Sequence, residues 1–211
     1  MCGRYALAPS SKQKSEQLRR CETTRHVENP LQHRAYPIGI CHCQRPPCSE
    51  FSEMNWGLVP SWSRDGVNSG KLINARAESI FEKPSFREVI QTRRCLVPAD
   101  SFYEWRKEPD GRKLPYRILL KNGALMFMAG DLGYLGLRSK RTDHLLNYHN
   151  RPQRRNGSPA QPDAADTCFE RETQETGFPT MPAGKNNRRC LQPPANGLLR
   201  MYRVSERLER H

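Results

Sequence analysis

The feature that most constrains the fold of this chain is residues 93–130, where two turn signals separate short apolar segments. "EPDGRK" at residues 108–113 is a turn signal of the hairpin type, and Asn122-Gly123 marks a second turn between two short strands. The flanking segments, "RRCLVPADSFYEWRK" and "LPYRILLKNGALMFMAG", have the composition of half-buried strands, and the first alternates apolar and polar residues. We therefore predict an α+β fold that is mainly antiparallel β, with a helix from residues 75–92.

The rest of the chain has a different character. Residues 21–53 and 131–200 are rich in Arg, Pro, Gln and Asn and show little periodicity. Residues 151–197 contain four large apolar side chains, too few to offset the entropy of ordering that span. These two ranges are expected to be irregular or poorly ordered. At 211 residues, we expect one compact domain, 1–211, with a core that needs no metal or disulfide.

The net charge narrows the choice of partner. Thirty-five Lys and Arg against 22 Asp and Glu give +13, which favours a polyanion, nucleic acid first and a membrane surface second. The chain shows no apolar run of membrane-spanning length and no signal-peptide apolar region near its start. We expect a cytoplasmic monomer, nucleoid-associated when bound to DNA, whose eight Cys are mostly reduced thiols.

"MCGRY" opens the chain and raises one chemical possibility. Removal of Met1 would leave Cys2 with an α-amine and a thiol, of pKa about 8 and about 8.5 in unperturbed form. The amine can form a Schiff base with an aldehyde, and the thiol can then close a five-membered thiazolidine. Gly3 leaves the approach open, and Arg4 can lower the thiol pKa and hold a phosphate. The alternative is an accidental Cys in a frayed terminus.

Three further residues are candidates for chemistry. In "LINARAES", Asn74 and Arg76 share one face of an extended segment, where Asn could orient a reacting group and Arg could clamp a phosphate. The alternative is a polar strand end leading into a helix. In "ADSFYEW", Glu104 stands between two aromatic residues and is a candidate for a raised pKa and acid–base work. The commoner alternative is a Glu that faces solvent.

Aromatic and sulfur-containing clusters carry weaker signals. Trp56 and Trp62 could stack on the bases of single-stranded nucleic acid, or could be core residues, as we expect for at least one of them. Cys41, His42, Cys43 and Cys48 have poor spacing for zinc, so we expect no metal site and no cofactor.

Taken together and in order, "MCGRY", "NWGLVPSW", "LINARAESIFEKPSF", "RRCLVPADSFYEW" and "FMAG" resemble the SRAP (SOS response-associated peptidase) family of abasic-site processing proteins. The resemblance covers residues 1 to about 10 and 54–130. It implies a compact, mainly β domain with a basic groove for single-stranded DNA.

The resemblance also implies a function and residue roles. Met1 is lost by self-cleavage or by an aminopeptidase. Cys2 then condenses with the ring-opened aldehyde of an abasic site in single-stranded DNA and forms a thiazolidine crosslink, with associated peptidase and lyase chemistry. Asn74 would orient the reacting centre and Glu104 would act as the acid–base. The DNA would be contacted by Arg4, Trp56 and Arg76.

Two family motifs are missing: Tyr-Asn-x-Ala-Pro before "NWGL", and His-x-Arg-Met-Pro after "FMAG", whose His helps to stabilise the abasic sugar. With suitable codons, dropping one base turns residues 31–36 into Ser-Asn-Thr-Ala-Pro and residues 160–167 into His-Asn-Arg-Met-Pro-Leu-Ile. We therefore hypothesise that 21–53 and 131–200 are read out of frame. His149, in "YHNRPQ", imitates part of the second motif and is a weak candidate to replace its His.

Three alternatives to the family function stay open. A thiol protease would share Cys2, but it needs an activating base and an oxyanion site. A non-enzymatic binder would use the Arg-rich segments and would not depend on Cys2. An inactive gene remnant follows from the frame hypothesis.

Overall fold

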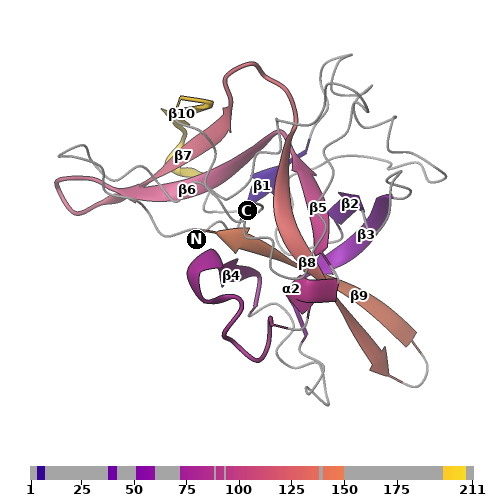
Figure 1. Ribbon diagram of the computed structural model, residues 1–211. Coiled ribbons are helices and arrows are strands. Elements are labelled where there is room, and N and C mark those ends of the chain that lie inside the picture. Colours follow the sequence, from indigo (N-terminus) through magenta and orange to yellow (C-terminus); the bar gives the residue numbers. More distant parts are fainter. Residues whose placement is uncertain are drawn as a thin grey trace.

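A computed structural model describes residues 4–7, 38–41, 51–59, 72–87, 89–92, 94–137, 140–149 and 197–207. They form two β-sheets, and the short helical turns lie between two strands of the second sheet (Figure 1). The first sheet has the order β1 (Tyr5–Ala6), β6 (Ser101–Lys107), β7 (Lys113–Leu120), β10 (Leu199–Arg203). The second has the order β3 (Phe51–Trp56), β2 (Ile38–Cys41), β5 (Arg94–Ala99), β8 (Met126–Leu137), β9 (Lys140–His149), β4 (Asn74–Arg76). Most neighbours are antiparallel; β9 pairs in parallel with β4 and also with β3, so the predicted class is confirmed.

Both predicted turns are present, and glycine makes each of them possible. At residues 108–112, the Gly111 amide donates to the Glu108 carbonyl and the chain turns through a φ of 86° at Gly111. Asn122-Gly123 joins β7 to β8 with a φ of 73° at Gly123. A side chain with a Cβ rarely adopts such values, so these positions set the registers of the strands that follow.

The segment 94–107 is two strands rather than the single half-buried strand that its pattern predicts. The chain leaves the second sheet after β5 and enters the first as β6, and Asp100 lies at the crossing. The amide of Asp100 donates to the Ala6 carbonyl at 2.8 Å. Cys95, Leu96 and Val97 are all fully buried, because β5 is covered on both faces.

The main core lies between the two sheets. The first sheet contributes Tyr5, Phe102 and Ile118, and the second contributes Val97 and Met128. Each such side chain stabilises the fold by about 1.5–3 kcal/mol when it is fully removed from water. A smaller core packs residues 77–90 against β8 and includes Ile80, Phe86 and Ile90.

The predicted helix over 75–92 is wrong in its extent. Residues 74–76 form β4, a 3₁₀ turn (η1) covers Ala77–Ser79, and the α-helix α2 is only Val89–Thr92. Turns occupy residues 80–87, where Pro84 has no amide hydrogen to donate. The apolar spacing is real, since Ile80, Phe86 and Ile90 are buried, but consecutive turns achieve it.

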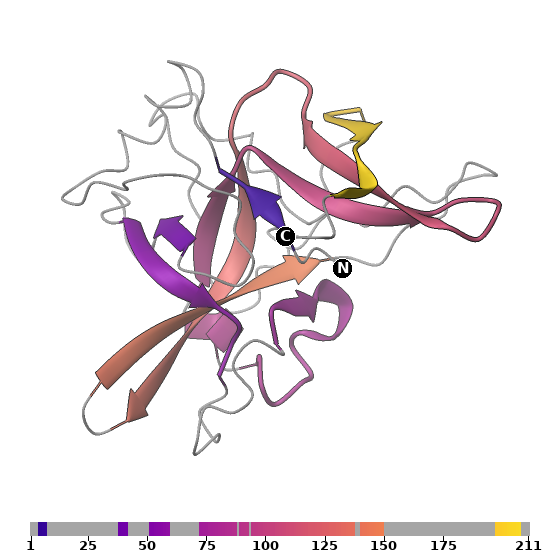
Figure 2. The same ribbon diagram turned by 180° about the vertical axis from the view of Figure 1, so that it is seen from behind.

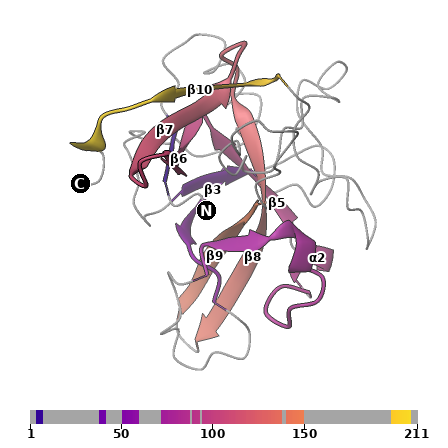
Figure 3. The same ribbon diagram turned by 90° about the vertical axis from the view of Figure 1, so that its left-hand side faces the viewer.

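The expectation of irregular structure over 21–53 and 131–200 was too broad. Strands β2 and β9 fall entirely in these ranges, as do the first half of β3, the second half of β8 and the first two residues of β10. They are strands because they pair with neighbours, and the β8–β9 hairpin extends well beyond the other strands (Figure 3). Tertiary pairing overrides a weak local pattern here. None of the helices within the described residues has the length and hydropathy needed to cross a bilayer.

Candidate functional site

Arg4 is the first described residue, and Cys2 and Gly3 lie outside the described residues. The carbonyl of Arg4 accepts a hydrogen bond from the amide of Tyr103 at 2.9 Å, so the chain two residues after Cys2 is fastened beside Glu104. The guanidinium carbon of Arg4 is 6.0 Å from the ring centroid of Trp105, within the range of a cation–π contact.

Asn74 and Arg76 lie on the same side of β4, as their spacing predicts. Ala75 between them is buried, whereas Arg76 is exposed and Asn74 is partly exposed. The parallel pairing of β4 with β9 sets Asn74 opposite Asn147 and Arg76 opposite His149. The segment continues into a 3₁₀ turn and does not become a regular helix.

Trp56 is a core residue with 2% of its surface exposed, which confirms the core alternative for this Trp; Trp62 lies outside the described residues. The ring of Trp56 meets Tyr5 edge to face, with centroids 5.5 Å apart and planes at 67°. Its indole Nε1 donates to the Ile73 carbonyl at 2.8 Å. Trp56 therefore joins β1 to the residue before Asn74, and this burial is a poor fit to the predicted DNA contact.

Glu104 is buried, with 4% of its surface exposed, so the alternative of a solvent-facing Glu is wrong. It lies opposite Tyr116 on β7 and on the same side of β6 as the core residue Phe102. Within the described residues, two buried side-chain oxygens accept no hydrogen bond: Oδ1 of Asn74 and Oε1 of Glu104. Other atoms of both residues make contacts, so the observation concerns these two acceptors alone.

Four segments distant in sequence thus meet through a short chain of contacts. Tyr5 contacts Trp56, and Trp56 holds the residue that precedes Asn74. On the other side, Arg4 is bonded to the residue that precedes Glu104. Arg4 and Trp56 make these contacts themselves, and Asn74 and Glu104 each follow a residue that does. Cys2 lies outside the described residues. For the sulfur cluster, Cys41 ends β2, and His42, Cys43 and Cys48 also lie outside them.

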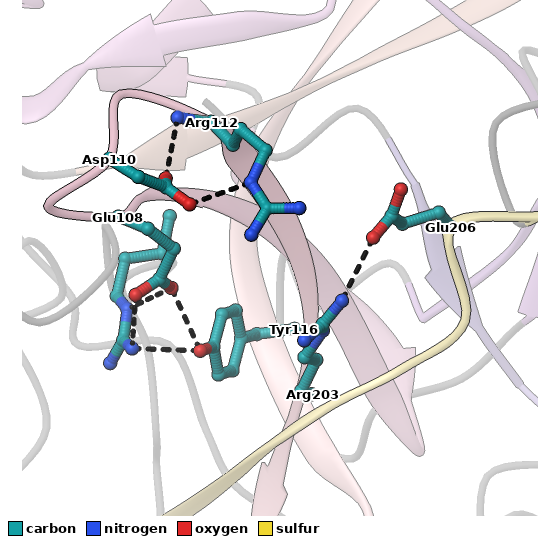
Figure 4. Close-up of polar contacts among 7 residues, drawn as sticks. Glu108, Asp110, Arg112, Tyr116, Arg203 and Glu206 are labelled. Atoms are coloured by element: carbon teal, nitrogen blue, oxygen red, sulfur yellow. Dashed lines mark hydrogen bonds and ion pairs between the residues drawn. The ribbon is translucent and has the colours of Figure 1, made fainter.

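A polar network beyond Glu104 was missed from the sequence. Arg106 donates two hydrogen bonds to the carboxylate of Glu108, at 2.9 and 3.0 Å, and a third to the hydroxyl of Tyr116 at 2.8 Å. The hydroxyl of Tyr116 in turn donates to Glu108 at 2.9 Å, and Figure 4 shows the two groups facing each other. The alternation of Arg106 and Glu108 was a usable signal, but Tyr116 is brought in only by strand register.

This network shifts the ionisation of its members. Hydrogen bonds from Arg106 and then Tyr116 hold the pKa of Glu108 below its ordinary 4.5. Burial, followed by the hydrogen bond to Glu108, raises the pKa of Tyr116 above 10.0. In the adjoining turn, the backbone and side-chain N–H groups of Arg112 hold the pKa of Asp110 below its usual value.

Comparisons with known proteins identify relatives. The sequence model of the family described as SOS response associated peptidase (SRAP) matches residues 1–141. Abasic site processing protein YoaM of Bacillus subtilis is 48% identical over 82 residues, which cover 39% of this chain and 36% of YoaM. Abasic site processing protein HMCES of Mus musculus is 42% identical over 70 residues, covering 31% of this chain and 20% of HMCES. The matches span little more than a third of these relatives' length at most.

A solved structure supports the fold. A protein from Bacteroides thetaiotaomicron has a TM-score of 0.75 to this chain, covers 100% of it and 95% of itself, and is 24% identical. A second, from Bordetella bronchiseptica, has a TM-score of 0.70 at 19% identity, covering 97% of this chain and 100% of itself.

Proposed function

Because the chain belongs to the SOS response associated peptidase (SRAP) family, we propose that it processes abasic sites in single-stranded DNA through Cys2. Two observations support the proposal. The matched relatives are named abasic site processing proteins. In the structure, contacts connect Tyr5 of β1 with Trp56, and Trp56 with the residue before Asn74. The observation that most supports the proposal is the hydrogen bond from the Tyr103 amide to the Arg4 carbonyl, beside Glu104. Two residues span at most about 7 Å, so Cys2 is tethered within that reach of Arg4.

The chemistry follows from the aminothiol. Hydrolysis of the Met1–Cys2 bond frees the α-amine, which adds to the aldehyde carbon of the open abasic sugar. Loss of water from that adduct gives an imine. The thiol then adds its sulfur to the imine carbon and its proton to the nitrogen, which closes the thiazolidine ring. Formation of the imine also opens a route to cleavage of the DNA strand by a lyase-type elimination.

Each remaining residue has a role that suits its place. Glu104 takes a proton from the attacking amine and returns one to the departing hydroxyl, a task for a carboxyl group out of bulk water. Asn74 orients the sugar, and Arg4 and Arg76 hold flanking phosphates. Trp56 positions Asn74 from the core instead of touching DNA. His149, whose backbone is in register with Arg76, is the available substitute for the missing family His.

The test is crosslinking of the full chain to a short single-stranded oligonucleotide with one abasic site. We expect a product that survives a denaturing gel, with N-terminal mass spectrometry showing that Met1 is gone. Cys2→Ala keeps the amine but loses the thiol, so it should give only an imine that borohydride can trap. Glu104→Gln should slow crosslinking by about 10²-fold or more while the fold is kept.

Two results would contradict the proposal. A stable crosslink that forms equally well with Cys2→Ala would exclude the thiazolidine. If well-folded protein with a free Cys2 amine gives no crosslink, the proposed activity is excluded. Cleavage of a peptide without DNA would instead favour a thiol protease, and salt-dependent binding alone would favour a non-enzymatic binder.

A further inference from the structure

One face of the first sheet packs against the main core, and the centre of the opposite face is also buried, at Ser101, Tyr103 and Leu119. The exposed residues of that opposite face lie at its margins, on β10 and at the β6–β7 turn. Side chains alternate along each strand, and Phe102 and Ile118 mark the core side. The opposite side, which we call the outer face, carries the residues in register with Tyr103 and Arg117. Its charged residues among those described are all basic: Arg4, Lys107, Lys113, Arg117 and Arg200. The core side holds the acidic Glu104.

Tyr202 stands at the exposed edge of this outer face. β10 lies along β7 at the edge of the sheet, and the yellow strand is beside β7 in Figures 1, 2 and 3. With 39% of its surface exposed, Tyr202 is the one large apolar side chain left open among the described residues. An isolated exposed aromatic is ordinary, but this one has arginines on two sides.

The two arginines fix the ring and surround it with positive charge. The guanidinium carbon of Arg200 is 5.8 Å from the Tyr202 ring centroid. Nη1 of Arg117 donates to the Tyr202 hydroxyl at 3.3 Å, and its Nε donates to the Ser101 hydroxyl at 2.8 Å. Arg117 is thus anchored to β6 and to the ring at once, so the ring is held in place from two sides.

We propose that Arg117, Arg200 and Tyr202 form a second contact for single-stranded DNA, apart from the lesion site. Stacking on an aromatic ring beside guanidinium groups is how proteins hold unpaired bases without regard to sequence. The charged side chains of the described outer face are all basic, which matches a polyanion such as DNA. A base must be unpaired to reach the ring, so the occupant is a single strand. The choice of DNA as the polyanion rests on the proposed function.

The sheet geometry predicts how many nucleotides separate the lesion site from Tyr202. Arg4 immediately precedes β1, and Tyr202 lies on β10, the two outer strands of the same sheet, with β6 and β7 between them. Three strand spacings make about 14 Å, which roughly four stacked nucleotides cover at about 3.4 Å each. Lengthening the DNA on one side of the lesion should therefore raise affinity once about four nucleotides are added, and lengthening on the other side should not.

The first test measures binding of an intact, labelled oligothymidine of about 20 nucleotides by fluorescence anisotropy. Tyr202→Ala should raise Kd about tenfold, within the range for losing one stacked base. Arg200→Gln should weaken binding and lower the slope of log K against log salt by about 0.7. Tyr202→Phe keeps the ring, so it should bind within about twofold of wild type.

Arg203→Gln is the matched control. Arg203 is on the same strand but points to the core side, where it pairs with Glu206 at 2.8 Å. It removes the same charge as Arg200→Gln and should leave Kd within about twofold of wild type, since an exposed ion pair contributes little. Equal losses in Arg200→Gln and Arg203→Gln would overturn the proposal, as would unchanged binding by Tyr202→Ala.

A second measurement separates this contact from the lesion chemistry. Tyr202→Ala should crosslink a very short abasic oligonucleotide at the wild-type rate, because such a strand cannot reach β10. Binding that depends on Tyr202 without any crosslinking would keep this contact and reject the proposed function. Crosslinking with binding indifferent to Tyr202 would do the reverse.

Discussion

At the scale of single residues, the contacts of Trp56 change what its motif means. A Trp in "NWGLVPSW" can be read as a platform for a base or as part of the core. Its contacts with Tyr5 and with the Ile73 carbonyl assign it to the core, where it couples the N-terminal strand to Asn74. Its influence on DNA chemistry is therefore expected to be indirect.

Trp56→Phe tests that coupling. The change removes the indole donor to Ile73 and some volume, and it should lower the free energy of unfolding by about 1–3 kcal/mol. It should also slow crosslinking, because the support before Asn74 is lost. Ile118→Val is the control: it costs about 0.5–1.5 kcal/mol in the same core and keeps the hydrogen bond from Trp56 to Ile73. Equal crosslinking rates in the two variants, compared at similar stability, would contradict the coupling.

Glu108 gives a residue-scale prediction on pH. Its pKa is lowered in the folded state by Arg106 and Tyr116, so the folded chain holds this proton less tightly than the unfolded chain does. The stabilisation is present above the ordinary 4.5 and is lost as pH falls through the lower folded-state pKa. Glu108→Gln should have a lower urea midpoint than wild type at neutral pH and the same midpoint near about pH 2. A gap that does not change with pH would contradict this.

At the scale of elements, local chemistry predicted the turns and tertiary contacts decided the rest. "EPDGRK" and Asn122-Gly123 were predictable because a positive φ is a property of a few residues. The break at Asp100 was not, since it depends on which sheet each half of the segment joins. The helix expected over 75–92 failed because buried positions such as Ile80 and Phe86 can be spaced by turns as well as by a helix.

The β6–β7 turn provides the element-scale prediction. A Cβ added at Gly111 would meet nothing within 4 Å, so any cost of Gly111→Ala comes from the backbone φ alone. We expect a loss of about 1–2 kcal/mol, measured by chemical denaturation. Gly111→Asn should cost less, because Asn adopts positive φ more readily. An Ala variant as stable as wild type would show that the turn relaxes to another conformation.

At the scale of the whole molecule, the sequence predicted the family, and its motifs made Asn74 and Glu104 candidates whose roles stay predictions. The Tyr116 that lies opposite Glu104 could not be predicted, because strand register brings it from the next strand. The strands β2 and β9 were missed because their sequences lack alternation and depend on partners.

The frame hypothesis is the whole-molecule prediction. When read one base later, the gene of this protein should encode Ser-Asn-Thr-Ala-Pro across codons 31–36 and His-Asn-Arg-Met-Pro across codons 160–167. A protein made in the restored frame would regain the family His and should crosslink faster than this chain. Codons that give neither motif would dismiss the hypothesis and leave a divergent member of the family.

The two-residue strand β1 has a thermodynamic consequence. It is attached to the sheet by few hydrogen bonds, including those at Arg4 and Ala6, so its local opening should require much less free energy than global unfolding. A ligand that engages Arg4 binds only the closed form and must raise that opening energy by its own binding energy. Hydrogen exchange at the amides of Tyr5 and Tyr103 would then slow when DNA is added, reporting occupancy of the N terminus before any covalent bond has formed.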